Sequence, residues 1–123
     1  MKYDPDVSPD PTRWLETDDE ERALAIRQYH KKAKEPTGQN AQLHAVIHAV
    51  VENQLAEGHA VAVATLSRLM TEGLERHDAI HAIGAIVAAD LFDMMKQQAP
   101  HDPEQYARKL RALTAAGWRA GLV

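Results

Sequence analysis

Two pairs of histidines in this sequence have the spacing of metal-chelating residues on a helix. His44 and His48 are four residues apart, and so are His77 and His81. Residues at this spacing lie ~6 Å apart on one face of an α-helix, so two imidazoles can bind one metal ion. Glu52 continues the first row after four more residues. Since the chain has seven histidines and no cysteine, a transition metal would be bound through imidazoles and carboxylates.

The sequence around these pairs predicts an all-α fold. Apolar side chains recur with helical spacing, no proline lies between Pro36 and Pro100, and no segment alternates with the period of a strand. Asn40 and Asp102 are positioned to cap helices, and glycines and prolines separate the helical segments. Five helices are predicted, over about residues 18–34, 41–57, 60–73, 76–98 and 103–116.

Length and composition predict a single small domain. The 123 residues are 45% hydrophobic, which is enough for one core, and 5% aromatic, so the core is expected to be aliphatic. Residues 1–16 contain three prolines and four acidic residues without apolar periodicity. We expect them to form an extended N-terminal arm, and residues 17–123 to form a compact bundle of four to five helices.

Charge and hydropathy narrow the range of partners. The chain has 14 Lys and Arg against 18 Asp and Glu, a net charge of −4, which argues against a nucleic-acid partner. No apolar run reaches the ~18 residues of a membrane span, and the first residues lack the apolar core of a secretory signal. We therefore expect a cytoplasmic bacterial protein without a membrane partner. No motif implies a nucleotide or organic cofactor, and a homo-oligomer is left open.

Helical geometry predicts that both histidine pairs face the core at one end of the bundle. On the helix predicted for residues 41–57, the first histidine lies within the apolar stripe, the second lies at its edge, and Glu52 lies beyond it. On the helix predicted for residues 76–98, both histidines lie within the stripe. In an up-and-down bundle these helices run parallel, with helix 60–73 between them, so the pairs share one layer.

A third helix is expected to bring another histidine to this layer. His30 lies near the C-terminal end of helix 18–34, whereas His59 and His101 are expected in loops at the opposite end. Inward-facing imidazoles cannot all be charged, because like charges would repel in a desolvated layer. They must be neutral and hydrogen-bonded, or bound to a cation.

Three functions are compatible with such a layer. The first is binding of one transition metal, zinc, nickel or iron, by His44, His48, His77 and His81, with Glu52 orienting an imidazole or serving as an alternate ligand. The second is a non-enzymatic helical interaction module with a neutral, hydrogen-bonded histidine layer, and the third is a small-ligand pocket. A closed four-histidine site would be structural, and an open one could support hydrolysis, so enzymatic activity is left open.

Known metal-binding motifs match these residues only in part. His77, Asp78 and His81 have the spacing of the HExxH metalloprotease motif, but the shorter Asp replaces the water-activating Glu. Ferritin-type and hemerythrin-type di-iron sites, and HD phosphohydrolases, need further carboxylate or histidine ligands that are not evident here. The DinB-type helical metalloproteins, with a His triad in a bundle, fit the expected geometry better.

The same residues resemble a bacterial family classed as a domain of unknown function, found chiefly in proteobacteria. Its pattern is roughly NPxLHxxxHxxxExQL, a short helix, RHxxxH and a long helix ending near a Trp. Residues 40–55 and 76–81 carry the likeness, with Ala41 in place of the Pro and Phe92 near the Trp position. The resemblance covers about residues 40–113 and implies a small helical fold without an activity. The motif positions that it implies are His44, His48, Glu52, His77 and His81.

Overall fold

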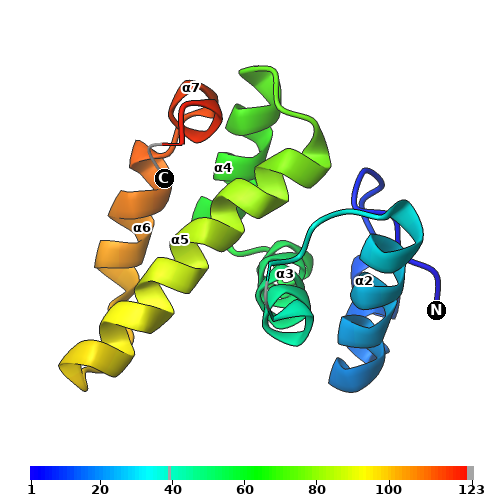
Figure 1. The fold of residues 1–123 in the computed structure, drawn as a ribbon. Coiled ribbons are helices and arrows are strands. Elements are labelled where there is room, and N and C mark those ends of the chain that lie inside the picture. Colours follow the sequence, from blue (N-terminus) through cyan, green and yellow to red (C-terminus); the bar gives the residue numbers. More distant parts are fainter. Residues whose placement is uncertain (39, 122–123) are drawn as a thin grey trace.

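The computed structural model describes residues 1–38 and 40–121, which fold into seven helices with no strand (Figure 1). The helices are α1 (Pro11–Glu16), α2 (Asp19–Ala33), α3 (Ala41–Ala56), α4 (Ala60–Thr71), α5 (Arg76–Gln97), α6 (Pro103–Ala112) and α7 (Ala115–Arg119). The all-α prediction is confirmed, and α2 to α6 correspond to the five predicted helices. The last of these ends earlier than predicted, and a separate α7 follows it. No helix in the described ranges is long and apolar enough to cross a membrane.

Side-chain caps explain where several helices begin. The Asn40 side chain accepts a hydrogen bond from the backbone N–H of Leu43 at 2.9 Å, and Asp102 caps α6 in the same way. His59 caps α4, because its Nδ1 accepts from the backbone N–H of Ala62 at 3.1 Å. One of the two histidines expected in loops therefore has a local structural role.

The N-terminal segment is packed onto the helices and is only partly extended. It contains α1, and the side chains of Tyr3 and Trp14 are 8% and 1% exposed. Their ring centroids lie 5.5 Å apart, and Trp14 Nε1 donates to Asn53 Oδ1 on α3 at 2.9 Å. These aromatic contacts explain why the segment packs against the helices, although its prolines and acidic residues predicted an extended arm.

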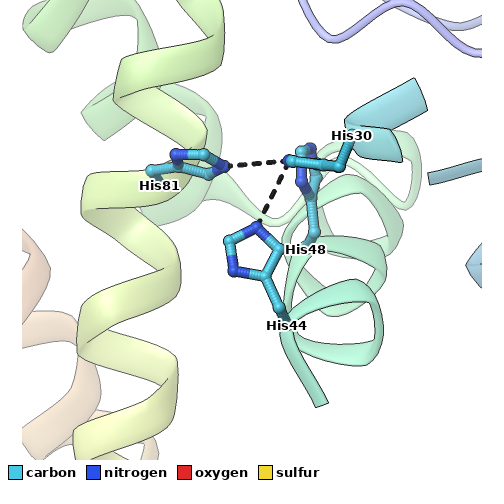
Figure 2. A group of neighbouring side chains, drawn as sticks. All are labelled: His30, His44, His48 and His81. Atoms are coloured by element: carbon cyan, nitrogen blue, oxygen red, sulfur yellow. Dashed lines mark hydrogen bonds between the residues drawn. The ribbon is translucent and has the colours of Figure 1, made fainter. Parts of the chain in front are cut away.

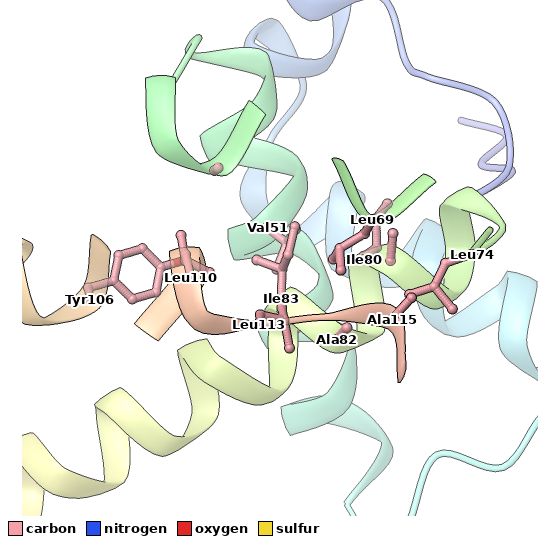
Figure 3. Packing of buried hydrophobic residues seen from close by; sticks show 12 residues of the cluster. Val51, Leu69, Leu74, Ile80, Ala82, Ile83, Tyr106, Leu110, Leu113 and Ala115 are labelled. Carbon is pink, nitrogen blue, oxygen red and sulfur yellow. The ribbon is translucent and has the colours of Figure 1, made fainter. Parts of the chain in front are cut away.

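The buried side chains of the described residues form two hydrophobic clusters that meet at α3. The larger cluster joins α3 to the helices that follow it (Figure 3), and the smaller one joins α3 to the N-terminal segment and α2. The larger cluster contains Val51, Ala62, Leu69, Leu74, Ala79, Ile80, Ala82, Ile83, Tyr106, Leu110, Leu113 and Ala115. The smaller cluster contains Tyr3, Trp14, Ala23, Ala25, Ile26, Ala45 and Ala49.

The position of α3 differs from the predicted up-and-down bundle. It packs directly against both α2 and α5, with no helix between α3 and α5. Figure 1 shows α3 viewed close to its axis while α5 lies across the view, so the two helices cross rather than run parallel. The buried face of α3 also differs, because Leu43 and Val46 are 46% and 42% exposed whereas Glu52 is buried. The neighbours on several sides of α3, chiefly α2 and α5, determine which of its faces is covered.

Candidate metal centre

Imidazoles from α2, α3 and α5 converge beside α3 (Figure 2). His30 comes from the last turn of α2, His44 and His48 from the first half of α3, and His81 from the second turn of α5. Among the described residues, each of these four can offer one ring nitrogen, and the four nitrogens lie within 4.8 Å of one another. We call these residues the histidine cluster. They are close enough to hold one metal ion.

Two distances within the histidine cluster match those between the ligands of one tetrahedral ion. His30 Nε2 lies 3.3 Å from His44 Nε2 and 3.5 Å from His81 Nε2. In a tetrahedral zinc site with Zn–N bonds of 2.0–2.1 Å, the nitrogens are about 3.3–3.4 Å apart. These imidazoles therefore need little movement to share an ion.

The backbone of α2 fixes the tautomer of His30. Its Nδ1 lies 2.8 Å from the carbonyl oxygen of Ile26. A carbonyl oxygen only accepts hydrogen bonds, so Nδ1 carries the proton and donates it. The lone pair is then on Nε2, the nitrogen that faces His44 and His81. A metal-binding imidazole needs this arrangement, in which one nitrogen donates to the protein and the other is free.

A buried tyrosine fixes the tautomer of His48. The Tyr3 hydroxyl donates a short hydrogen bond to Glu52 Oε2 and lies 2.7 Å from His48 Nε2. Since its single proton goes to the carboxylate, the hydroxyl accepts from the Nε2–H of His48. Nδ1 of His48 is then unprotonated, and it is buried with no hydrogen-bond partner among the described residues. An unpartnered buried lone pair of this kind suits a metal ligand.

A buried ion pair holds Glu52 behind this tyrosine. The two guanidinium NH groups of Arg76 each donate to a separate Glu52 oxygen at 2.8 Å, and one also donates to the carbonyl oxygen of Pro5 at 2.9 Å. Burial raises the pKa of Tyr3, and the adjacent Glu52 charge adds to this, so the hydroxyl remains a donor. Glu52 was predicted to orient an imidazole or to bind the ion, and it contacts His48 through Tyr3.

His77, the remaining predicted ligand, lies at the border of the histidine cluster. Its Nε2 is 3.0 Å from His81 Nε2, and its Nδ1 is 3.5 Å from a carboxylate oxygen of Glu35. It belongs to a second group of potential ligands with His30 and Glu35. The structure therefore brings together three of the four histidines predicted as ligands, together with His30, which was expected in the same layer.

Burial keeps the imidazoles of this region neutral. Together with the neighbouring imidazoles, it lowers the pKa of His48 to about 2 and that of His81 to about 3. Burial also lowers the pKa of His44, and that of His77 in spite of the Glu35 carboxylate beside it. At neutral pH these rings carry lone pairs rather than charge, which metal binding requires.

Sequence reasoning missed three residues around the histidine cluster: Tyr3, Glu35 and Arg76. Arg76 directly precedes His77 and carried a signal, since an arginine stands at that place in the pattern of the resembling family. Tyr3 and Glu35 lie outside the regular helices, where no periodicity marks them. His101, which was expected in a loop, pairs there with Asp90, and its Nδ1 is 2.9 Å from the carboxylate.

Comparisons with known proteins give no relative for this arrangement. No protein-family model, curated protein or solved structure matches the chain significantly. The resemblance to the bacterial family therefore stays a prediction, and the chemistry of the site is the basis for a function.

Proposed function

We propose that the protein binds one divalent transition-metal ion through the histidine cluster, His30, His44, His48 and His81. The observation that carries this proposal is the separation of 3.3 and 3.5 Å between Nε2 of His30 and its two neighbours, which is the ligand spacing of one tetrahedral ion. His48 contributes Nδ1, the nitrogen that Tyr3 leaves free.

Zinc and nickel suit this ligand set best. Neutral imidazoles bind zinc, nickel and copper well, whereas non-haem iron sites use carboxylates as well as histidines. Of the two nearby carboxylates, that of Glu52 already bonds to Arg76 and Tyr3. That of Glu35 lies 3.8 Å from His30 Nε2, farther than the neighbouring imidazole nitrogens. We therefore place iron third among the three metals that the sequence suggested.

Metal analysis of protein purified without a histidine tag tests the proposal. About one equivalent of zinc or nickel should co-purify or bind on addition, and binding should raise the melting temperature. Less than ~0.2 equivalents of any transition metal, with no thermal shift on adding zinc or nickel, would contradict metal binding. In that case the imidazoles form a metal-free layer.

Single substitutions identify the ligands. His30→Ala and His48→Ala should each weaken metal binding strongly, because either change removes one of the four ligands. His101→Ala is the matched control, since His101 pairs with Asp90 away from the histidine cluster and should leave metal binding intact. His77→Ala should weaken binding only modestly. If His77→Ala abolished binding while His30→Ala retained it, the ligand set would be the one predicted from the sequence.

One observation favours the second candidate, a metal-free interaction module with a neutral histidine layer. Imidazole nitrogens of neighbouring residues lie at hydrogen-bonding distance, most closely Nε2 of His77 and Nε2 of His81 at 3.0 Å. In that case His81→Ala would lower stability equally with and without added zinc. Under the proposed function, the same change would cost far more in the presence of zinc.

A further inference from the structure

A recess of about 250 Å³ opens beside the histidine cluster, between α3, α5 and α7. Three of the four cluster histidines line it, namely His44, His48 and His81. The remainder of its described wall is apolar and includes Ala88 of α5 and Trp118 of α7. An ion held by the cluster would therefore lie at one end of this mostly apolar recess.

The charges around this recess favour an anionic ligand. All four cluster ligands would be neutral imidazoles, so the ion would keep most of its double positive charge. Among the described residues, no Asp, Glu, Lys or Arg side chain lines the recess. The Glu52 carboxylate pairs with Arg76. The Glu35 carboxylate lies 3.8 Å from His30 Nε2, so it offsets only part of the ion's charge, and it does not line the recess. An anionic oxygen entering from the recess would offset the remaining positive charge of the ion.

The dimensions of the recess limit the rest of the ligand. An apolar cavity of about 150 Å³ is enough for benzene, so 250 Å³ admits a ligand of several carbon atoms. The recess thus fits a short apolar tail.

We propose that the recess binds a small monocarboxylate with a short apolar tail, with its carboxylate on the metal and its tail along the apolar wall. This inference rests on the proposed function, because the carboxylate needs the ion. Zinc-like ions accept such a ligand by expanding from four to five coordination or by releasing one imidazole. Of the cluster, His44 and His81 are half-buried, and these are the imidazoles best placed to move.

Cobalt(II)-loaded protein provides the test, because its visible absorption reports ligands that enter the coordination sphere. We expect acetate, propionate and butyrate to perturb the spectrum with dissociation constants that fall about fourfold per added methylene, the gain from burying one CH₂. Butanol, which has the tail without the charge, should leave the spectrum unchanged. Dissociation constants that do not depend on tail length, or spectra that do not change, would overturn the inference.

Two neighbouring alanines of α5 give a matched pair of variants. Ala88 lines the recess, whereas Ala89 is exposed. Ala88→Leu should fill the recess and reduce butyrate affinity to that of acetate. Ala89→Leu should keep the wild-type preference for longer tails. Ala85→Leu, at another alanine that lines the recess, serves as a second filling variant should Ala88→Leu fail to fold or to bind cobalt. A preserved tail-length preference in the filling variant would overturn the inference.

The outcomes separate this inference from the proposed function. Wild-type protein that binds no cobalt, zinc or nickel contradicts both. If the protein binds cobalt but the dissociation constants of the carboxylates do not depend on tail length, the recess is not the ligand site. The metal centre is unaffected by that result.

Discussion

The Tyr3 hydroxyl determines which nitrogen of His48 is free to bind a metal. It donates to Glu52 and accepts from Nε2–H of His48, which leaves the Nδ1 lone pair unshared. Tyr3→Phe removes the hydrogen bond that orients His48, and we expect zinc affinity to fall about 10- to 100-fold. The metal-free protein should lose about 1–3 kcal/mol of stability, because buried polar groups lose a partner. Competition titration with a chromogenic chelator and urea unfolding measure the two effects.

Tyr106→Phe is the control for this change. The Tyr106 hydroxyl also belongs to a buried ring and donates to Gln54 Oε1 at 2.7 Å, but it lies on α6 in the larger hydrophobic cluster. We expect Tyr106→Phe to lower stability without changing zinc affinity. Equal losses of zinc affinity in both variants would show that general destabilisation, rather than the contact with His48, governs binding.

The ion pair behind Tyr3 is expected to matter more than any pair on the surface. Arg76 and Glu52 are 6% and 1% exposed as side chains, so Arg76→Met leaves a buried carboxylate without its cation. We expect unfolding free energy to fall by about 3–5 kcal/mol. The pair of Arg68 and Glu72 is about one-third exposed, and Arg68→Met should cost about 1 kcal/mol. Urea unfolding of both variants checks the contrast, and equal losses would contradict it.

At the scale of helices, the sequence predicts where a helix begins and ends better than which of its faces is buried. Caps and helix-stopping residues are local, so the bounds of α3 and α5 agree with the predicted ranges to within one residue. The face of α3 depends on which helices pack against it, and spacing along one helix does not carry that information. Glu52 shows the consequence, because it lies off the apolar stripe of the sequence yet is buried by Arg76 and Tyr3 from other segments.

A bound metal ion would link α2 to α3 and α5. The smaller cluster between α2 and α3 contains mainly small side chains, including Ala23 and Ala25 of α2, so its packing stabilises α2 less than large side chains would. His30 adds a ligand from α2 to those of α3 and α5. We expect zinc to slow amide hydrogen exchange in α2 more than in α6, as measured by mass spectrometry. The same protection in both helices would contradict this local effect.

For the molecule as a whole, the histidine pairs could be found from the sequence but the complete site could not. Spacing of four residues identifies pairs on one helix, which gave His44 with His48 and His77 with His81. The grouping of His30 with three of them depends on how α2, α3 and α5 meet. Tyr3 belongs to the N-terminal segment, whose composition predicted an extended arm. The site thus depends on tertiary contacts between residues far apart in the sequence.

The buried imidazoles should make the metal-free protein sensitive to mild acid. Burial lowers the pKa of His48 to about 2 and that of His81 to about 3, whereas an unfolded chain protonates histidine near pH 6.5. Below that pH the unfolded state binds more protons than the folded state, so stability is full at neutral pH and falls on acidification. Each imidazole contributes up to about 1.4 kcal/mol per pH unit.

Urea unfolding in a chelator between pH 6.5 and 5 measures this loss, because most carboxylates are still ionised in that window. We expect the free energy of unfolding to decrease with falling pH, and to decrease less steeply in His81→Gln, which removes one of the imidazoles that resist protonation in the folded state. Bound zinc should oppose the loss, since its ligands remain unprotonated while it is bound. An identical slope in the wild type and in His81→Gln would contradict a neutral, buried His81.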